Sequence, residues 1–167
     1  MYDELTEVDI RKMREEMDYR IRVLRPKLIE DVQTARAFGD LSENFEYKCA
    51  KQEKNRNDSR IRYLDRMIRT AKVISADSKE DVVGLFDKVV IFNEKLQKEM
   101  SIQIVTTLRQ DALQGRISKE SPVGKALLGR RVGDRVLVKV SDELQYYLSV
   151  RSIEKGEDDA SMAISSY

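Results

Sequence analysis

The residues best suited to chemistry lie between two long helical patterns, in the stretch Ala37-Phe-Gly-Asp-Leu-Ser-Glu-Asn-Phe-Glu-Tyr47. Asp40 and Glu43 bring two carboxylates into this short segment. Carboxylate oxygens are hard ligands that suit Mg²⁺. Two carboxylates do not make a complete metal site, but they can complete a two-metal phosphoryl transfer centre, whose ions lie about 3.5–4 Å apart. The pattern therefore allows metal-assisted chemistry on phosphate in a site shared with another protein.

The same two residues also have a structural explanation. The D-x-x-E spacing of Asp40 and Glu43 is that of a capping box at the start of a helix. Asp40 would accept a hydrogen bond from a backbone N–H and Glu43 would reach back, which contributes about 0.5–2 kcal/mol. From the spacing alone the capping box is the stronger prediction, and the chemical alternative stays open.

The composition argues against an active site that works alone. The chain of 167 residues has no histidine, so the side chain that most often does acid–base catalysis near neutral pH is absent. Its single cysteine, Cys49, forms neither an internal disulfide nor a conventional zinc site. Because 37% of the residues are charged, we expect two small modules rather than one large core.

Two long helices must carry the acidic segment. Apolar residues recur every three or four positions in both, which is the spacing of a stripe along a helix. The first stripe is Ile10, Met13, Met17, Ile21, Leu24, Leu28, Val32 and Ala35. The second is Tyr47, Ala50, Ile61, Leu64, Ile68 and Ala71, with the polar residues Lys54 and Asn57 at two inner positions. Gly39 is suited to end the first helix in a left-handed turn, so we expect an antiparallel hairpin with a kink at Pro26.

The pattern changes after residue 74 to short β-branched segments that predict strands. They begin at Val82, Val89, Ser101, Arg135 and Tyr146, and a short helix is expected from Pro122 to Gly129. The predicted fold class is α+β in two domains: a coiled-coil hairpin over 1–76 with its acidic tip at 39–47, and a small domain over 80–155. Residues 156–167 are polar and aperiodic, which predicts a flexible tail.

Charge is unevenly distributed along the hairpin. Between Lys48 and Lys72 there are nine basic and three acidic residues, whereas the segment from Asp40 to Glu46 holds three acids and no base. A solvated charged surface would explain this distribution. Contact with a polyanion or an acidic protein surface is the functional alternative, although the net charge of +1 argues against an autonomous DNA-binding protein.

One stretch resembles a known family signature. Gly39-Asp-Leu-Ser-Glu-Asn-Phe-Glu-Tyr47 is similar to the GDLSENxEY motif of the GreA/GreB transcription elongation factors. Further similarities follow in family order, from about residue 4 to residue 154: Arg25-Pro, Ala35-Arg, Arg60-Ile-Arg-Tyr-Leu, Gly115-Arg-Ile-Ser-Lys-Glu-Ser-Pro-Val-Gly-Lys-Ala-Leu-Leu-Gly129 and Gly133-Asp-Arg-Val.

The resemblance implies a monomeric partner of bacterial RNA polymerase without an active site of its own. Its coiled coil would enter the secondary channel, and a C-terminal domain of FKBP-like fold would dock at the channel rim. Asp40 and Glu43 would share a polymerase-held Mg²⁺ and stimulate cleavage of the 3′ end of backtracked RNA. The other tip residues would support the geometry: Ser42, Asn44, Glu46 and Tyr47.

The resemblance also gives weaker expectations for contacts outside the tip. The residues expected to follow RNA or polymerase are Lys48, Lys51, Arg56 and Arg60, and those expected at the channel rim are Ile117, Ser118, Ser121 and Pro122. Phe45 stands where the family usually carries a small residue. Cys49 beside the tip is read as an ordinary small hydrophobic residue, with redox sensing as the alternative.

Other functions remain open from the sequence. A related protein could occupy the same channel and regulate or inhibit the polymerase without cleaving RNA. The FKBP-like module could instead be a chaperone or prolyl isomerase, for which Phe86, Phe92, Tyr146 and Tyr147 are the available aromatics. Nonspecific nucleic-acid binding is a further alternative. The acidic start and the lack of an apolar run of 18 residues predict a cytoplasmic protein that does not enter membranes.

Overall fold

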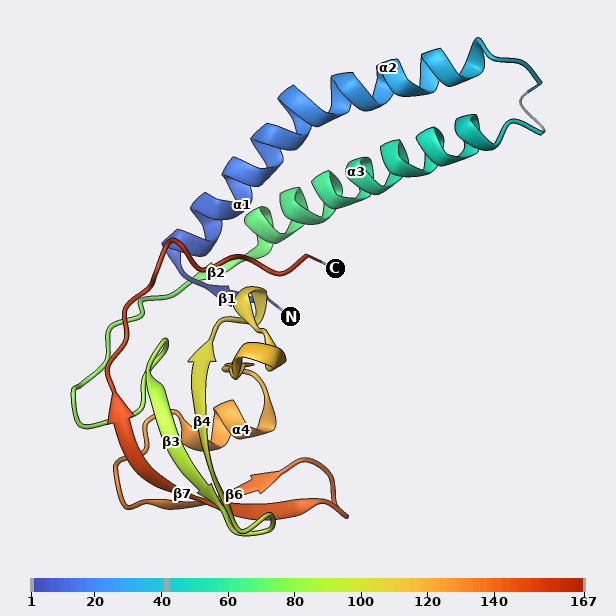
Figure 1. Cartoon of the computed structure of the whole chain (residues 1–167). Coiled ribbons are helices and arrows are strands. Elements are labelled where there is room, and N and C mark those ends of the chain that lie inside the picture. Colours follow the sequence, from blue (N-terminus) through green and yellow to red (C-terminus); the bar gives the residue numbers. More distant parts are fainter. Residues whose placement is uncertain (1, 41–42, 167) are drawn as a thin grey trace. The chain divides into compact units, whose positions relative to one another are not determined.

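A computed structural model describes residues 2–40 and 43–166 (Figure 1). The chain divides into two compact units. One is a helical hairpin over Ile10–Ala71, and the other combines Asp3–Asp9 with Lys72–Tyr167 around a β-sheet. This division confirms the predicted α+β class with two parts. Within the described residues, no helix is both long enough and apolar enough to cross a bilayer.

The first arm of the hairpin is helical over the predicted length, but its hydrogen bonding changes in the middle. It consists of α1 (Glu7–Tyr19), a π-helix (Arg20–Leu24) and α2 (Arg25–Arg36). Pro26 lies in the first turn of α2, and just before it the Arg25 N–H donates to the Arg20 carbonyl, five residues back. A proline has no N–H to donate, so the regular ladder is interrupted close to where the sequence predicts a kink.

The second arm is a single helix, α3 (Phe45–Thr70), which lies antiparallel to the first in Figure 1. Its buried side chains include Ile61, Leu64 and Met67, and Met13 of the first arm is fully buried. The most deeply buried apolar side chains of the hairpin lie at its end remote from the tip. Closer to the tip, Ala35 is the buried apolar residue of α2.

A buried polar cluster joins the arms at mid-length. Arg60 donates to both Glu16 oxygens, at 2.8 and 3.2 Å, and Arg20 donates to one of them at 2.8 Å. Asn57 accepts a bond from the Arg20 side chain at 3.0 Å and donates to the Arg20 carbonyl at 3.2 Å. Although burial opposes it, hydrogen bonding and charge from Arg60 and Arg20 lower the pKa of Glu16. These pairings fix one alignment of the two arms.

The second unit is built on a five-stranded sheet in the order β5-β4-β3-β7-β6. The strands are β3 (Lys88–Asn93), β4 (Lys98–Val105), β5 (Arg116–Ser118), β6 (Arg135–Lys139) and β7 (Gln145–Glu154). Neighbouring strands are antiparallel except β4 and β5. The short predicted helix is α4 (Pro122–Leu127), which begins with proline and is followed by Gly129 at φ +79°.

The strand predicted at Val82 is absent. Val83 is 2% exposed and belongs to the core, but its N–H donates to Arg130 and its carbonyl accepts from Gly129, both of which lie in a loop. The β-branched residues here therefore reflect burial rather than a strand ladder.

The N-terminal residues belong to the sheet-containing unit, which differs from the predicted boundary of the hairpin domain. β1 (Glu4–Leu5) pairs in parallel with β2 (Lys72–Val73), and Leu5 is fully buried. Thr6 and Asp9 form a reciprocal capping box at the start of α1: Thr6 N–H donates to Asp9 at 3.1 Å, and Asp9 N–H donates to Thr6 at 3.4 Å.

Arg109 is the last residue of a 3₁₀ turn (Thr107–Arg109), and its buried side chain binds residues of that N-terminal segment. Its Nε donates to Asp9 Oδ1 at 2.6 Å, and its Nη2 donates to Thr6 Oγ1 at 3.3 Å. The guanidinium also approaches Asp158 Oδ1 at 2.5 Å, without hydrogen-bond alignment of that oxygen. Both Arg109 and Asp9 have fully buried side chains, so their charges depend on one another.

The C-terminal segment differs from the predicted free tail. Met162 is 6% exposed and belongs to the hydrophobic core, while Ser165 N–H donates to the Leu108 carbonyl at 2.6 Å. Gly156 passes so close to Phe86 that an added Cβ would lie 1.9 Å from the Phe86 carbonyl oxygen. Although the segment is polar overall, Met162, backbone contacts and the approach of Asp158 to Arg109 attach it to the rest of its unit.

Candidate functional site

The tip of the hairpin begins where α2 loses its helical hydrogen bonds. The Phe38 N–H donates to the Ala35 carbonyl at 3.2 Å, three residues back. Gly39 then adopts φ +137°, in the region that favours glycine. The chain can therefore leave the helix sharply at the position where the sequence predicts a turn.

Asn44 closes the tip by satisfying both arms. Its Nδ2 donates to the Ala35 carbonyl at 2.7 Å, and its Oδ1 accepts from the Tyr47 N–H at 2.9 Å. The first bond serves an end carbonyl of α2, and the second serves an end N–H of α3, both of which lack partners within their own helix. One side chain thus joins the end of α2 to the start of α3.

The capping box predicted for Asp40 and Glu43 is therefore wrong. α3 starts at Phe45, and its N-cap is Asn44 rather than Asp40. Asp40 and Glu43 lie before the helix, and both are exposed. Ser42, predicted to support the tip, lies outside the described residues. Glu46 is an exposed acid in the first turn of α3, where it complements the helix dipole.

Basic side chains surround Tyr47 at the base of the tip. The Arg36 guanidinium lies 5.5 Å from the ring centroid, and the Lys51 ammonium lies 5.9 Å from it. A hydrogen bond with Arg36, aided by the charges of Lys51 and Arg36, lowers the pKa of the Tyr47 hydroxyl. Tyr47 therefore contacts α2 as well as lying on α3.

The predicted RNA or polymerase contacts fall into two groups. Lys48, Lys51 and Arg56 are exposed on α3, and Arg56 is paired with the exposed Glu53 at 2.9 Å. Arg60 is only 4% exposed and is bonded to Glu16, which contradicts its prediction as a contact residue. Arg60 lies at regular spacing among the other basic residues of α3, so the sequence alone does not indicate that its side chain faces the first arm.

The predicted rim contacts surround the turn from β5 to α4. Ser118 is 6% exposed, and its carbonyl accepts from the Ser121 hydroxyl at 2.7 Å. Ser121 Oγ accepts from the Gly124 N–H at 3.0 Å as the N-cap of α4. Both serines thus hold the turn, while Ile117 is half-buried and Pro122 is exposed. Docking through these residues stays a prediction.

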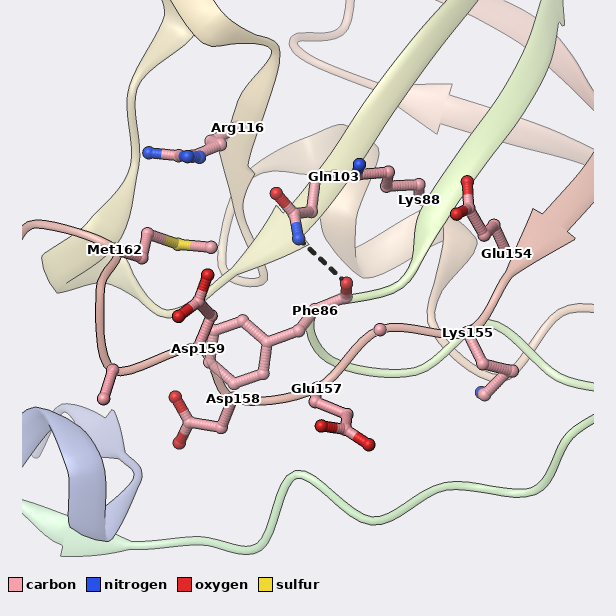
Figure 2. A pocket seen from close by; sticks show the side chains of 12 residues that line it. Phe86, Lys88, Gln103, Arg116, Glu154, Lys155, Glu157, Asp158, Asp159 and Met162 are labelled. Carbon is pink, nitrogen blue, oxygen red and sulfur yellow. Dashed lines mark hydrogen bonds between the residues drawn. The ribbon is translucent and has the colours of Figure 1, made fainter.

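A separate cavity of about 610 Å³ lies in the sheet-containing unit, between the sheet and the C-terminal segment (Figure 2). Charged side chains dominate its lining, including Lys88, Arg116 and Glu157, and the dashed bond joins Gln103 Nε2 to the Phe86 carbonyl at 3.0 Å. Phe86 is the aromatic residue in the lining, and its side chain is fully buried. The cavity has little of the aromatic surface that a proline-binding site needs.

Family models match both parts of the chain. The N-terminal model for the GreA/GreB transcription elongation factors covers residues 4–73, and the C-terminal model covers residues 77–155. The chain belongs to the GreA/GreB family of transcription elongation factors.

Curated relatives agree with this membership. The chain is 44% identical over 137 residues to the transcription elongation factor GreA of Bacillus licheniformis, covering 81% of this chain and 86% of that protein. It is 43% identical over 137 residues to GreA of Thermoanaerobacter pseudethanolicus, covering 81% and 87%. Among solved structures, the chain is similar to GreA factor homolog 1 of Thermus thermophilus, with 25% identity, a TM-score of 0.43, and coverage of 93% of this chain and 100% of that chain.

Three features of this GreA/GreB family member were not predicted from the sequence. The signature asparagine, Asn44, is a cap and cross-link, and its position just before a helical stripe could have indicated this role. The capping box of Thr6 and Asp9 also has a sequence signal, in the T-x-x-D spacing. No local pattern indicates that Arg109 lies beside Asp9, because 100 residues separate them.

Proposed function

We propose that this protein stimulates RNA cleavage by bacterial RNA polymerase, with Asp40 and Glu43 as the carboxylates that complete the polymerase centre. The observation that carries the proposal is the role of Asn44 as the cap of α3. Because another side chain caps the helix, Asp40 and Glu43 are not needed for that purpose, and both are exposed at the end of the hairpin. Family membership supplies the polymerase as the expected partner.

The donor set fits a shared metal rather than a resident one. Within the described residues, no group of three or more histidine, cysteine or acidic side chains could hold an ion. Asp40 and Glu43 would supply oxygen ligands to a polymerase-held Mg²⁺, which stabilises developing negative charge and lowers the pKa of bound water when present. The protein would thus act as a cofactor of the polymerase and not as an enzyme.

The reaction must leave RNA that can be extended. Elongation requires a 3′ hydroxyl, so the oxygen of water attacks the phosphorus and the bond from phosphorus to the upstream 3′ oxygen breaks. The upstream RNA regains its 3′ hydroxyl, and the released fragment carries the 5′ phosphate. In this step Asp40 and Glu43 would orient the attacking water and support the metal-bound geometry.

The remaining surfaces support insertion and docking of a monomer. Lys48, Lys51 and Arg56 present positive charge beside the tip, which favours the nascent RNA 3′ end inside the secondary channel. Ile117 and Pro122 remain available for the channel rim, with Ser118 and Ser121 shaping the turn that presents them. A family member that only occupies the channel and regulates the polymerase is the alternative.

The test is cleavage in a backtracked elongation complex with Mg²⁺. The wild type is expected to release 3′-terminal RNA fragments, and Asp40→Ala and Glu43→Ala are each expected to lose at least about 10-fold in rate, as for lost support of a metal ion. Glu30→Ala, which removes an exposed acid from α2, is the matched control and should keep full activity. Wild-type binding without cleavage would instead identify a channel-occupying regulator.

A further inference from the structure

Two phenylalanines are exposed at the tip. Phe38 is 72% exposed and Phe45 is 76% exposed, although the whole chain has only four phenylalanines. Of the other two, Phe86 is fully buried in the core and Phe92 is half-buried in β3. Neither tip ring contributes appreciably to a core, and exposed rings of this size are unfavourable unless they have a partner.

The backbone holds these two residues at the same place. The Ala35 carbonyl accepts both the Phe38 N–H, at 3.2 Å, and Asn44 Nδ2, at 2.7 Å. Phe45 directly follows Asn44 and is the first residue of α3. The two aromatic residues therefore flank one shared hydrogen-bond acceptor on opposite sides of the turn.

Charged side chains of both signs lie near this aromatic pair: the exposed acids Asp40, Glu43 and Glu46 belong to the tip itself, and basic residues lie at its base. Arg36 and Lys51 lie over the Tyr47 ring, and Lys48 is exposed three residues after Phe45, on the same side of α3. Aromatic rings interleaved with basic side chains are the combination by which proteins bind single-stranded nucleic acid, stacking on bases while attracting phosphates.

We propose that Phe45, together with Phe38, stacks on the base of the unpaired RNA 3′ nucleotide. Phe45 is then a positioning residue, which holds the displaced nucleotide while the carboxylates act on the neighbouring phosphate. The inference rests on the proposed function for its setting, in that the tip must meet backtracked RNA. It adds a contact with the base. In the proposed function the carboxylates contact the metal and the basic side chains contact the phosphates.

The first experiment compares cleavage of two backtracked RNAs that differ only in whether the 3′ nucleotide carries a base or is abasic. Phe45→Ala should slow cleavage of the natural RNA about 10-fold, the scale of one base–aromatic stack. On the abasic RNA, wild type and Phe45→Ala should cleave at the same reduced rate. Leu96→Ala, which removes a side chain that is 59% exposed in the turn after β3, is the control and should match wild type on both.

Folding is not a confounding factor for Phe45→Ala, because alanine is a better helix former than phenylalanine at an exposed position. Equal slowing on natural and abasic RNA would overturn the inference in favour of a contact with the polymerase wall. An unchanged rate on natural RNA would also overturn it. Concentration-dependent self-association that Phe45→Ala abolishes would assign the rings to a second copy.

The second experiment does not depend on cleavage. In an Asp40→Asn/Glu43→Gln background, a 5-iodouridine at the RNA 3′ end of the backtracked complex is irradiated and the protein adduct is mapped by mass spectrometry. An adduct at Phe45 or Phe38 supports the inference, even if the wild-type protein proves not to stimulate cleavage. Adducts only on the polymerase, or none, would overturn the inference while leaving the cleavage assay to decide the proposed function.

Discussion

Two four-residue segments with similar spacing have opposite roles in this protein. Thr6 and Asp9 form a capping box, are nearly or fully buried, and are bonded to Arg109. Asp40 and Glu43 have the spacing of a capping box but lie exposed before a helix that Asn44 caps. The position of the helix start, rather than the spacing, decides which pair serves the fold and which can serve a partner.

Burial explains why the difference matters energetically. A buried carboxylate must be paired, so Asp9 and Arg109 are each required by the other. An exposed carboxylate is solvated whether or not it has a partner, and its loss costs the fold little. The buried pair should therefore contribute far more to the free energy of unfolding than the exposed tip acids.

Asp9→Ala should destabilise the protein by about 3–5 kcal/mol, because it leaves the Arg109 charge buried without its main partner. Urea denaturation followed by circular dichroism measures the change. Glu7→Ala, which removes an exposed acid two residues earlier in the same turn, is the control. If Asp9→Ala lowers the free energy of unfolding by less than about 1 kcal/mol, Asp9 behaves like a member of an exposed ion pair. The contrast between Asp9 and the tip acids would then be wrong.

Glu16→Gln tests an acid of intermediate burial, whose side chain is 23% exposed. Arg60 and Arg20 lower its folded-state pKa, so its contribution is present above the unfolded pKa of about 4.3 and is lost as the pH falls through the folded value. The variant should lose about 1.5–3 kcal/mol at neutral pH, the scale of hydrogen bonds to charged groups. Denaturation at neutral pH and below pH 4 measures the difference in the free energy of unfolding between wild type and Glu16→Gln. This difference should be smaller in acid. A difference that does not change with pH would contradict the conclusion that the ionised Glu16 carboxylate stabilises the fold.

Asn44→Ala should cost about 0.5–2 kcal/mol, the usual loss for an N-cap. Because Asn44 also bonds to the Ala35 carbonyl, hydrogen exchange should rise at the Tyr47 amide and around the end of α2. Asn44→Asp is the matched variant, since it keeps the acceptor for Tyr47 but loses the donor for Ala35. Unchanged exchange in Asn44→Ala would show that another residue caps α3.

Asp40→Ala and Glu43→Ala should change the free energy of unfolding by no more than about 0.5 kcal/mol each, as for ordinary exposed sites. Thermal unfolding of both variants beside wild type measures this smallest effect. A larger decrease in the free energy of unfolding would show that the two acids stabilise the fold. Near-neutral stability together with lost cleavage would separate their function from folding.

Much of the architecture can be predicted from local sequence patterns. The three- and four-residue spacing predicts both arms, the alternating segments predict β3, β4, β6 and β7, and Pro122 and Gly129 delimit α4. The tip signature identifies the family and the two candidate carboxylates. These features are local, so neighbouring residues are enough to reveal them.

The tertiary structure shows which residues from distant parts of the chain are buried together. It paired Arg60 with Glu16 across the hairpin, joined Asp9 to Arg109, and packed Met162 of the presumed tail into the core. It also assigned the cap of α3 to Asn44 rather than to Asp40. Such pairings are contacts between residues far apart in the chain, so local spacing and composition do not predict them.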